Sequence, residues 1–204
     1  MKPEEISVTY DALAEHWNGE EFNRENGITQ HEKALRFLAD DQLQGGRGID
    51  IGCGSSGRFI DLMLSKKLTV EGLDISPEML RLAKVRHPKQ TFHLADICKW
   101  EHDGKYDFIT AWDSIWHAPL EEHEAILRKL CNALADTGVL IFTSGAVDEP
   151  GEVSNNCKGM PLYHAALGIP KLLEIIADCG VICRHLEFDQ FPDTHLYLIV
   201  QKTS

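Results

Sequence analysis

The sequence predicts an α/β fold: a doubly wound, mostly parallel sheet that N-terminal helices precede and a C-terminal antiparallel hairpin closes. Three observations support this prediction. Short apolar strands alternate with helical segments from about residue 45 onward, a pattern typical of parallel sheets with crossover helices. A glycine-rich turn follows the first of these strands. The last two strands are separated only by "QFPDT", which is too short for a parallel crossover and therefore predicts a hairpin.

The chain length of 204 residues suits one domain with a full core, and we expect residues 1–204 to form that single domain. Residues 1–44 are predicted to be N-terminal cap helices, and residues 45–202 the core that carries the ligand site. Residues 145–168 interrupt the alternation because they are rich in Gly, Asn, Pro and Asp. A loop this long inside a compact domain is usually functional, so we expect a loop that acts as a lid over a substrate.

The N-terminal segment has the signals of two helices. Pro3, followed by two acidic residues, is a favourable start for the first. Its apolar positions repeat at helical spacing, at Ile6, Tyr10, Leu13 and Trp17. A second helix is predicted over Thr29–Gln42, and Gly45-Gly46 then ends the segment.

In the core, each strand is followed by a helix or a turn signal. The strand "RGIDIG" leads into the helix "RFIDLMLSKK", and the strand "LTVEGLDI" leads into a helix that Ser76 caps and Pro77 begins. The segments "QTFHLAD" and "YDFITAW" are predicted strands, a helix follows from about 120 to 134, and "VLIFTSG" is a strand. The helix "IPKLLEIIADCG" and the strands "VICRHLEFD" and "HLYLIVQKT" complete the chain.

Composition excludes several classes of partner. The chain has 20 Lys plus Arg against 32 Asp plus Glu, a net charge of -12, so its surface repels nucleic-acid phosphates. We expect neither a nucleic-acid partner nor a membrane partner, and we expect a cytoplasmic protein, because the N-terminus lacks the apolar region of a signal peptide. The six cysteines contain no C-x-x-C pair, so we expect free thiols and no metal site. The sequence leaves the oligomeric state open.

The turn "GIDIGCGSSGRF" has two interpretations. From Gly52 it reads G-x-G-x-x-G, the spacing of a dinucleotide-binding turn, and Asp74 at the end of the next strand is the acid that a nucleotide ribose needs. A dinucleotide-dependent oxidoreductase is therefore one hypothesis. Asp50 argues against it, because a carboxylate at the strand end suits an ammonium group better than a pyrophosphate.

Four segments in a fixed order, followed by the hairpin, resolve the ambiguity: "IDIGCGSSG", "VEGLDISPEML", "LADICKW" and "YDFITAWDSIWHAPLEE". Together they resemble the motifs of the class I S-adenosylmethionine-dependent methyltransferases, in the small-molecule branch, over roughly residues 45–202. The resemblance implies a Rossmann-like fold and S-adenosylmethionine as cofactor. One departure is that Ser56 stands where the family usually has its third glycine, which is here Gly57; Ser56 fits if its φ is negative.

The resemblance implies a set of cofactor-binding residues. In it, Asp50 holds the methionine amino group, Asp74 accepts from the ribose hydroxyls, and Asp96 accepts from the adenine amino group. Ile75 lies against the adenine ring, Ile97 offers a backbone N–H, and the first helix folds over the cofactor. The full predicted set is Tyr10, Asp50, Gly52, Gly54, Asp74, Ile75, Asp96, Ile97 and Trp112.

The methyl acceptor is expected beside the segment "WDSIWHAPLEE". His117 is the candidate catalytic residue; it can act as a general base, shape the pocket, or make only a structural hydrogen bond. Trp116, Tyr163 and His164 are candidate substrate contacts. The few basic residues near these segments, Lys99, Arg128 and Lys158, do not favour a strongly anionic acceptor. The function predicted is methyl transfer to a small molecule; the alternatives are a non-catalytic S-adenosylmethionine-binding partner subunit and the oxidoreductase.

Overall fold

The computed structural model describes residues 1–19 and 22–203, so positions 20, 21 and 204, which belong to the predicted ranges 1–44 and 1–204, lie outside the described residues. The described chain is built around a seven-stranded sheet of order β3-β2-β1-β4-β5-β9-β8. Its strands are β1 (Arg47–Ile51), β2 (Thr69–Asp74), β3 (Thr91–Leu94), β4 (Tyr106–Ala111), β5 (Leu134–Gly145), β8 (Val181–Phe188) and β9 (His195–Lys202).

The pairing of the strands confirms the predicted fold class. Strands β3, β2, β1, β4 and β5 pair in parallel. Strand β9 is antiparallel to both of its neighbours, β5 and β8, so the C-terminal hairpin closes the sheet as predicted. The hairpin also folds back so that β9, rather than β8, lies beside β5.

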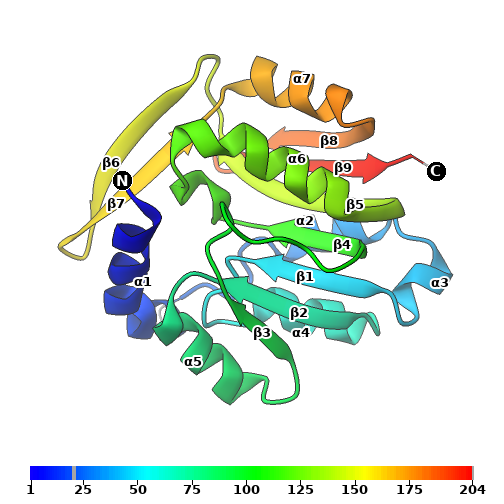
Figure 1. Cartoon of the computed structure of the whole chain (residues 1–204), viewed down its shortest axis with the longest axis horizontal. Helices are drawn as coiled ribbons and strands as arrows, with labels where there is room; N and C mark the ends of the chain where they lie inside the picture. Colours follow the sequence, from blue (N-terminus) through cyan, green and yellow to red (C-terminus); the bar gives the residue numbers. More distant parts are fainter. Residues whose placement is uncertain (20–21, 204) are drawn as a thin grey trace.

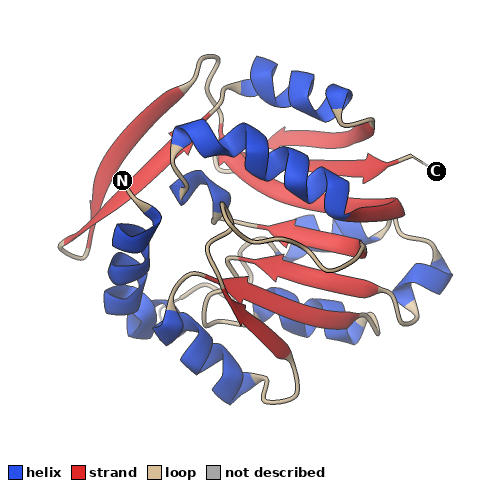
Figure 2. Cartoon of the chain, in the orientation of Figure 1, coloured by secondary structure: helices blue, strands red, loops and turns tan. Residues whose placement is uncertain are grey.

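Helices cover both faces of the sheet (Figures 1 and 2). Helices α6 (His123–Ala133) and α7 (Ile169–Asp178) pack on one face, and α2 (Ile28–Leu35) and α4 (Arg58–Ser65) pack on the other. Helix α5 (Pro77–Arg86) begins as predicted, with Ser76 Oγ accepting from the Met79 N–H and Pro77 in the first turn. Two short 3₁₀ turns, η1 (Ile115–His117) and η2 (Leu120–Glu122), connect β4 to α6.

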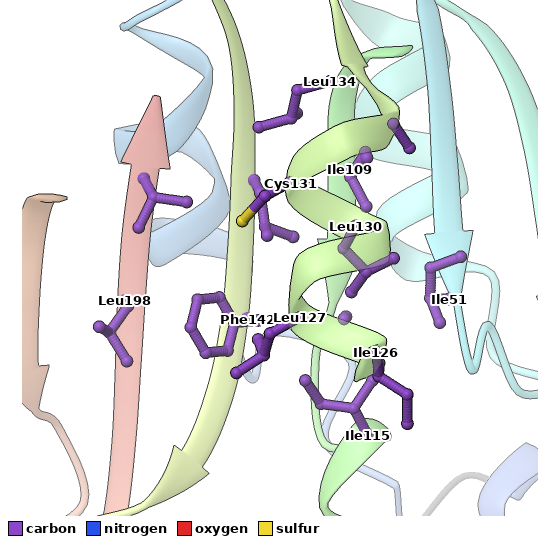
Figure 3. Packing of buried hydrophobic residues seen from close by; sticks show 14 of the residues in the cluster. Ile51, Ile109, Ile115, Ile126, Leu127, Leu130, Cys131, Leu134, Phe142 and Leu198 are labelled. Atoms are coloured by element: carbon purple, nitrogen blue, oxygen red, sulfur yellow. The ribbon is translucent and has the colours of Figure 1, made fainter. Parts of the chain in front are cut away.

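The larger hydrophobic core lies between α6 and the sheet (Figure 3). Leu127, Leu130 and Cys131 of α6 point toward the strands, where they meet Ile109 of β4 and Phe142 of β5. The helical spacing of these α6 residues is what the sequence predicted. Burial of such side chains from water supplies the main stabilisation of the α6 face, at about 1.5–3 kcal/mol for each large apolar side chain.

The prediction of one helix over Thr29–Gln42 is wrong. The structure has α2, which ends at Leu35, and a short α3 (Asp40–Leu43). The Phe37 carbonyl, which a continuing helix would use, accepts instead from Gln201 Nε2 at 2.9 Å. The Gln42 side chain accepts from the Ala39 N–H at 3.1 Å and so starts the new helix.

The prediction of an irregular loop over residues 145–168 is also wrong, because this segment contains a β-hairpin. Strands β6 (Gly151–Cys157) and β7 (Met160–Ala166) pair antiparallel along their full length. The turn between them, Lys158-Gly159, has positive φ at both residues, 51° and 87°, as a two-residue hairpin turn requires. Strand β6 is exposed on both faces, so it lacks the apolar alternation by which a strand is recognised in a sequence.

The hairpin and helix α1 (Pro3–Asn18) lie across the side of the sheet where the parallel strands end (Figure 1). They contact each other through Ile6 of α1 and the buried Tyr163 and Ala165 of β7. The Ser7 hydroxyl also donates to the Ile75 carbonyl at 3.0 Å, which ties α1 to the end of β2. No helix in the described ranges has the length and apolarity needed to cross a bilayer.

Candidate functional site

A cavity of about 280 Å³ lies at the carboxyl ends of the parallel strands, under α1 and β7. In open α/β sheets this edge is the usual ligand site. The structure brings most of the predicted site residues to its wall: Tyr10, Gly52, Gly54, Asp74, Ile75, Asp96, Ile97, Trp112, Trp116, His117 and His164. Asp50 and Tyr163 are not part of the lining.

The glycine turn after β1 needs its glycines for two different reasons. Gly52, Gly54 and Gly57 all have positive φ, at 69°, 56° and 66°, a conformation that disfavours other residues. At Gly52 a Cβ would lie 2.3 Å from the Cβ of Ser114, so this glycine also allows the turn to approach the β4 loop. At Gly54 no atom lies within 4 Å of an added Cβ, so its backbone is open on that side. Ser56 is not among the residues with positive φ, as its substitution for the usual glycine required.

Asp74 connects the glycine turn to the end of β2. Its Oδ2 accepts from the Gly54 N–H at 2.8 Å, and its Oδ1 accepts from the Ser76 N–H at 2.9 Å. Burial raises the pKa of Asp74 to about 6, although these backbone donors oppose the shift. Each oxygen retains a second acceptor position, which is what a pair of ligand hydroxyls would use.

Asp50 lies behind the cavity wall rather than in it. Asp50 is buried on β1, which pairs with β2 and β4, and burial raises its pKa to about 7, while the charge of Arg58 lowers it and that of Asp74 raises it further. A carboxyl group in this position can act on a ligand through its charge or through an intervening water.

Unpartnered polar atoms gather around the cavity. Asp96 Oδ1 accepts from the Cys98 N–H at 2.9 Å, but its buried Oδ2 makes no hydrogen bond in the described residues and has only an ion-pair contact, with Lys99 Nζ at 3.6 Å. Side-chain atoms of five other lining residues are also without a hydrogen-bond partner in the described residues: Trp17, Ser55, Trp112, Ser114 and His164. Buried polar groups in native proteins are normally satisfied, so this concentration of orphans indicates a site built for a polar ligand.

His117 is held by three hydrogen bonds. Trp116 Nε1–H donates to its Nε2 at 2.9 Å, and because an indole nitrogen only donates, Nε2 must be unprotonated. Nδ1–H therefore donates to the Tyr163 carbonyl at 2.6 Å, and the Tyr10 hydroxyl, 2.6 Å from Nε2, donates to it. Burial lowers the pKa of His117 to about 3, against the effect of the Tyr163 carbonyl. The imidazole is thus neutral at working pH and its lone pair is already engaged.

Tyr163 contributes to the site through this backbone carbonyl. Its hydroxyl points elsewhere: it donates to Glu152 Oε2 at 2.6 Å and accepts from the Leu120 N–H at 3.2 Å. From the same strand, His164 lies in the lining, with its ring centroid 4.7 Å from that of His117 and 5.6 Å from that of Trp116.

Asp113 is a lining residue that the sequence analysis did not single out. It follows β4 with a φ of 50°, which is rare outside glycine and marks a constrained position. Its N–H donates to Thr143 Oγ1 at 2.8 Å, and its Oδ1 accepts from His195 Nε2 at 3.0 Å. His195 Nδ1 in turn contacts Asp189 Oδ1, so the imidazole bridges two carboxylates. Burial lowers the pKa of His195, but the two carboxylates outweigh it and raise the pKa above its ordinary value.

Arg58 is the second lining residue that the sequence analysis did not single out. It is the first residue of α4, directly after Gly57, so its position beside the cavity follows from the turn that the glycines form. The available signal was this adjacency to the glycine motif. Asp113 had a comparable signal, since it directly follows the predicted strand "YDFITAW" at the carboxyl edge of the sheet.

The sequence matches the family described as "Methyltransferase domain" over residues 23–164. A trans-aconitate 2-methyltransferase of Methylobacterium radiotolerans is 36% identical over 110 residues, which cover 52% of this chain and 41% of the relative. A ubiquinone biosynthesis O-methyltransferase of Shewanella halifaxensis is 28% identical over 156 residues, which cover 71% of this chain and 62% of the relative. The chain thus matches about half the length of these curated relatives.

Solved structures share the fold. The DhpI complex with S-adenosylhomocysteine superposes with a TM-score of 0.71 at 20% identity, covering 98% of this chain and 97% of that one. The magnesium protoporphyrin IX methyltransferase of Synechocystis PCC 6803 with bound S-adenosylhomocysteine superposes with a TM-score of 0.71 at 19% identity, covering 97% and 95%. At these identities the likeness establishes the architecture of the chain.

Proposed function

Because the chain belongs to the methyltransferase domain family, we propose that it transfers a methyl group from S-adenosylmethionine to a small-molecule acceptor. The observation that carries the proposal is the cavity at the carboxyl edge of the sheet, with an open glycine turn, two acids at strand ends and unpartnered polar atoms. The relatives' names, trans-aconitate 2-methyltransferase and ubiquinone biosynthesis O-methyltransferase, support a small-molecule acceptor rather than a macromolecule.

The residues present fit this cofactor. Asp74 offers acceptor positions for the ribose hydroxyls, and Asp96 Oδ2, which accepts no hydrogen bond in the described residues, offers one for the adenine amino group. Ile75 and Ile97 supply apolar surface for the adenine ring. Asp50 supplies negative charge near the glycine turn, where the cofactor's ammonium group is proposed to lie. Trp112 and Tyr10 complete the proposed cofactor wall.

When bound, S-adenosylmethionine supplies an activated methyl group on a sulfonium centre. The chain's contribution is then to align the acceptor and exclude water, and alignment of this kind can lower a barrier by roughly 7–11 kcal/mol. Trp116, His117 and His164 form the wall where the acceptor is proposed to lie. The β6–β7 hairpin covers this wall through Leu162 and His164, so we propose that residues 145–168 act as the lid over the acceptor.

The activity is tested by incubating the protein with S-adenosylmethionine and a panel of small acids, phenols and amines, trans-aconitate included. Mass spectrometry then measures S-adenosylhomocysteine and methylated product. Formation of both in equal amounts supports an enzyme. Tight binding of S-adenosylhomocysteine without turnover across the panel would favour the alternative of a non-catalytic partner subunit. For the location we propose the cytoplasm, which the acidic chain and its six unpaired cysteines favour.

The affinity for S-adenosylhomocysteine should rise with pH between about 5.5 and 7.5. Burial raises the pKa of Asp50 to about 7 and that of Asp74 to about 6, so both are partly protonated in the free protein below neutrality. An ammonium group and ribose hydroxyls favour the ionised carboxylates, so binding releases protons and becomes tighter as the pH rises through these values. Calorimetry in buffers of different ionisation enthalpy measures the released protons.

The control for this experiment is Asp50→Asn, because an asparagine side chain cannot ionise. In this variant the affinity for S-adenosylhomocysteine should change less with pH in the range nearest pH 7. An affinity that is constant, or that falls between pH 5.5 and 7.5, would exclude ionisation of these carboxyl groups on binding.

Replacement of His117 should weaken acceptor binding more than the chemical step. With its lone pair engaged by Tyr10 and Trp116 and its pKa near 3, His117 is a positioning residue and a poor base. We expect His117→Ala to raise the acceptor KM by about tenfold and to leave kcat within about tenfold, with the acidic limb of the pH profile unchanged. Tyr10→Phe removes a hydrogen-bond donor to the same nitrogen. The effects of Tyr10→Phe and His117→Ala on the acceptor KM should therefore be non-additive. A fall in kcat of roughly 10²–10⁴ with loss of the acidic limb would identify His117 as the base instead.

A further inference from the structure

Arg58 presents a guanidinium group to the cavity in a fixed orientation. Its Nε–H donates to the Asn26 carbonyl at 2.9 Å, and its Nη1 donates to Ser56 Oγ at 3.2 Å. The rings of Phe59 and Phe22 lie with their centroids 4.2 Å and 4.8 Å from its Cζ. Two hydrogen bonds and two aromatic rings therefore set the plane of the guanidinium before a ligand arrives.

This guanidinium has no acidic partner in the part of the chain that the structure describes. None of the ion pairs closer than 4.0 Å among residues 1–19 and 22–203 includes Arg58, and its Nη2 makes no hydrogen bond there. Asp113 and Asp50 attract it only from a greater distance. Charges that are removed from water are normally paired, so a half-buried guanidinium facing a cavity indicates a missing anion.

The neighbouring polar atoms are donors as well. The indole N–H groups of Trp17 and Trp112 are buried without a partner in the described residues, and an indole can only donate. The Trp17 ring packs on Phe22 with centroids 5.6 Å apart, and the Trp112 ring packs on Phe59 with centroids 6.2 Å apart. Both indoles thus belong to the aromatic layer that holds Arg58, and this layer combines a positive charge, unused donors and apolar surface.

We infer that Arg58 receives a carboxylate in this cavity, that the carboxylate belongs to the methyl acceptor, and that the acceptor is a small organic acid. The inference rests on the proposed function and narrows its substrate class. A guanidinium fork matches a carboxylate with two parallel hydrogen bonds, and the surrounding rings suit an apolar body on the acid. The inference replaces the sequence-based expectation that the acceptor is not strongly anionic. That expectation was based on Lys99, Arg128 and Lys158 and did not consider Arg58.

The cofactor also carries one carboxylate, on its methionine part, so the experiment has to separate two sources. Calorimetry measures binding of S-adenosylhomocysteine and of 5′-methylthioadenosine, which lacks the amino-acid part, to wild type and to Arg58→Gln. The protein loaded with S-adenosylhomocysteine is then titrated with benzoate and succinate and with their neutral amides. Arg24→Gln is the matched control, because Arg24 donates to the Ser56 carbonyl at 3.1 Å but does not line the cavity.

The expected result is that the loaded wild type binds at least one of the two acids about tenfold or more tightly than its amide. Arg58→Gln should abolish this preference while changing the affinities for both nucleosides by less than about threefold, and Arg58→Lys should restore part of the preference because it keeps the charge. Circular dichroism and a thermal melt establish that each variant is folded. If Arg58→Gln does not fold, the preference for the acids over their amides is compared between Arg58→Lys and wild type instead.

Two results would overturn the inference. If wild type binds the acids no better than the amides, or binds none of them, the acceptor is not recognised through a carboxylate. If Arg58→Gln weakens S-adenosylhomocysteine about tenfold but not 5′-methylthioadenosine, Arg58 holds the cofactor's carboxylate. Neither result affects the proposed function, which fails if wild type does not bind S-adenosylhomocysteine or binds it without turnover across the acceptor panel.

Discussion

Replacement of His195 by leucine should lower the free energy of unfolding by about 3–5 kcal/mol, because it leaves the carboxylate of Asp189 buried without its cation. The side chains of His195 and Asp189 are 7% and 5% exposed, so water cannot take over the lost interaction. For a chain of this length the loss corresponds to a fall in melting temperature of roughly 6–20 °C, measured by calorimetry or circular dichroism. The same change releases Asp113, which His195 holds at the cavity wall.

Two comparisons separate the effect of the unpaired charge from a general loss of packing. His185→Leu is the matched control: His185 pairs with Glu187, whose side chain is 44% exposed, so its loss should cost less than about 1 kcal/mol. The double variant His195→Leu with Asp189→Leu removes the unpaired charge and should recover about 2 kcal/mol or more. Equal losses in the single and double variants would show that packing, and not the charge, determines the stability here.

The pH dependence of this stabilisation has a definite sign. The two carboxylates raise the pKa of His195 above its unfolded value of about 6.5. The contribution of His195 is therefore complete below about pH 6.5 and is lost as the pH rises through the folded pKa. The difference in unfolding free energy between wild type and His195→Leu should accordingly shrink at alkaline pH; a difference that grows with pH would contradict the assignment of a charged imidazole.

Replacement of Asp74 by alanine should weaken S-adenosylhomocysteine binding by roughly ten- to hundredfold, about 1.5–3 kcal/mol. Asp74 is proposed to accept from the ribose hydroxyls, and it also accepts from the Gly54 N–H, so its loss removes ligand contacts and loosens the glycine turn together. Calorimetry of the folded variant measures the change. Asp136→Ala, an exposed substitution at the start of β5, should leave the affinity unchanged. An unaltered dissociation constant for Asp74→Ala would remove Asp74 from the site.

The cofactor side of the candidate site was largely readable from the sequence, because its chemistry is local. Gly52, Gly54 and Asp74 belong to the turns at the ends of two consecutive strands, and such turns converge at one edge of any parallel sheet. The cap of α5 was predictable for the same reason, since Ser76 and Pro77 act on residues only a few positions away. Spacing along the chain therefore contained the information that placed these residues on the cavity wall.

The acceptor side depends on contacts between distant segments, which the sequence does not display. The partners of His117 come from α1, η1 and β7, so its engaged lone pair became apparent only when these elements were placed together. The contact between Asp113 and His195 likewise joins residues that are 82 positions apart. The β6–β7 hairpin was missed because its exposed strand has no apolar alternation, although its Lys158-Gly159 turn was a usable signal.

Calorimetric titration of the wild-type protein with S-adenosylhomocysteine and with NAD⁺ distinguishes a cavity that holds S-adenosylmethionine from one that holds a dinucleotide. We expect a micromolar dissociation constant for S-adenosylhomocysteine, which corresponds to a binding free energy of about -8 kcal/mol, with one site per chain and no measurable heat of binding for NAD⁺. Micromolar binding of NAD⁺ together with no binding of S-adenosylhomocysteine would contradict this expectation.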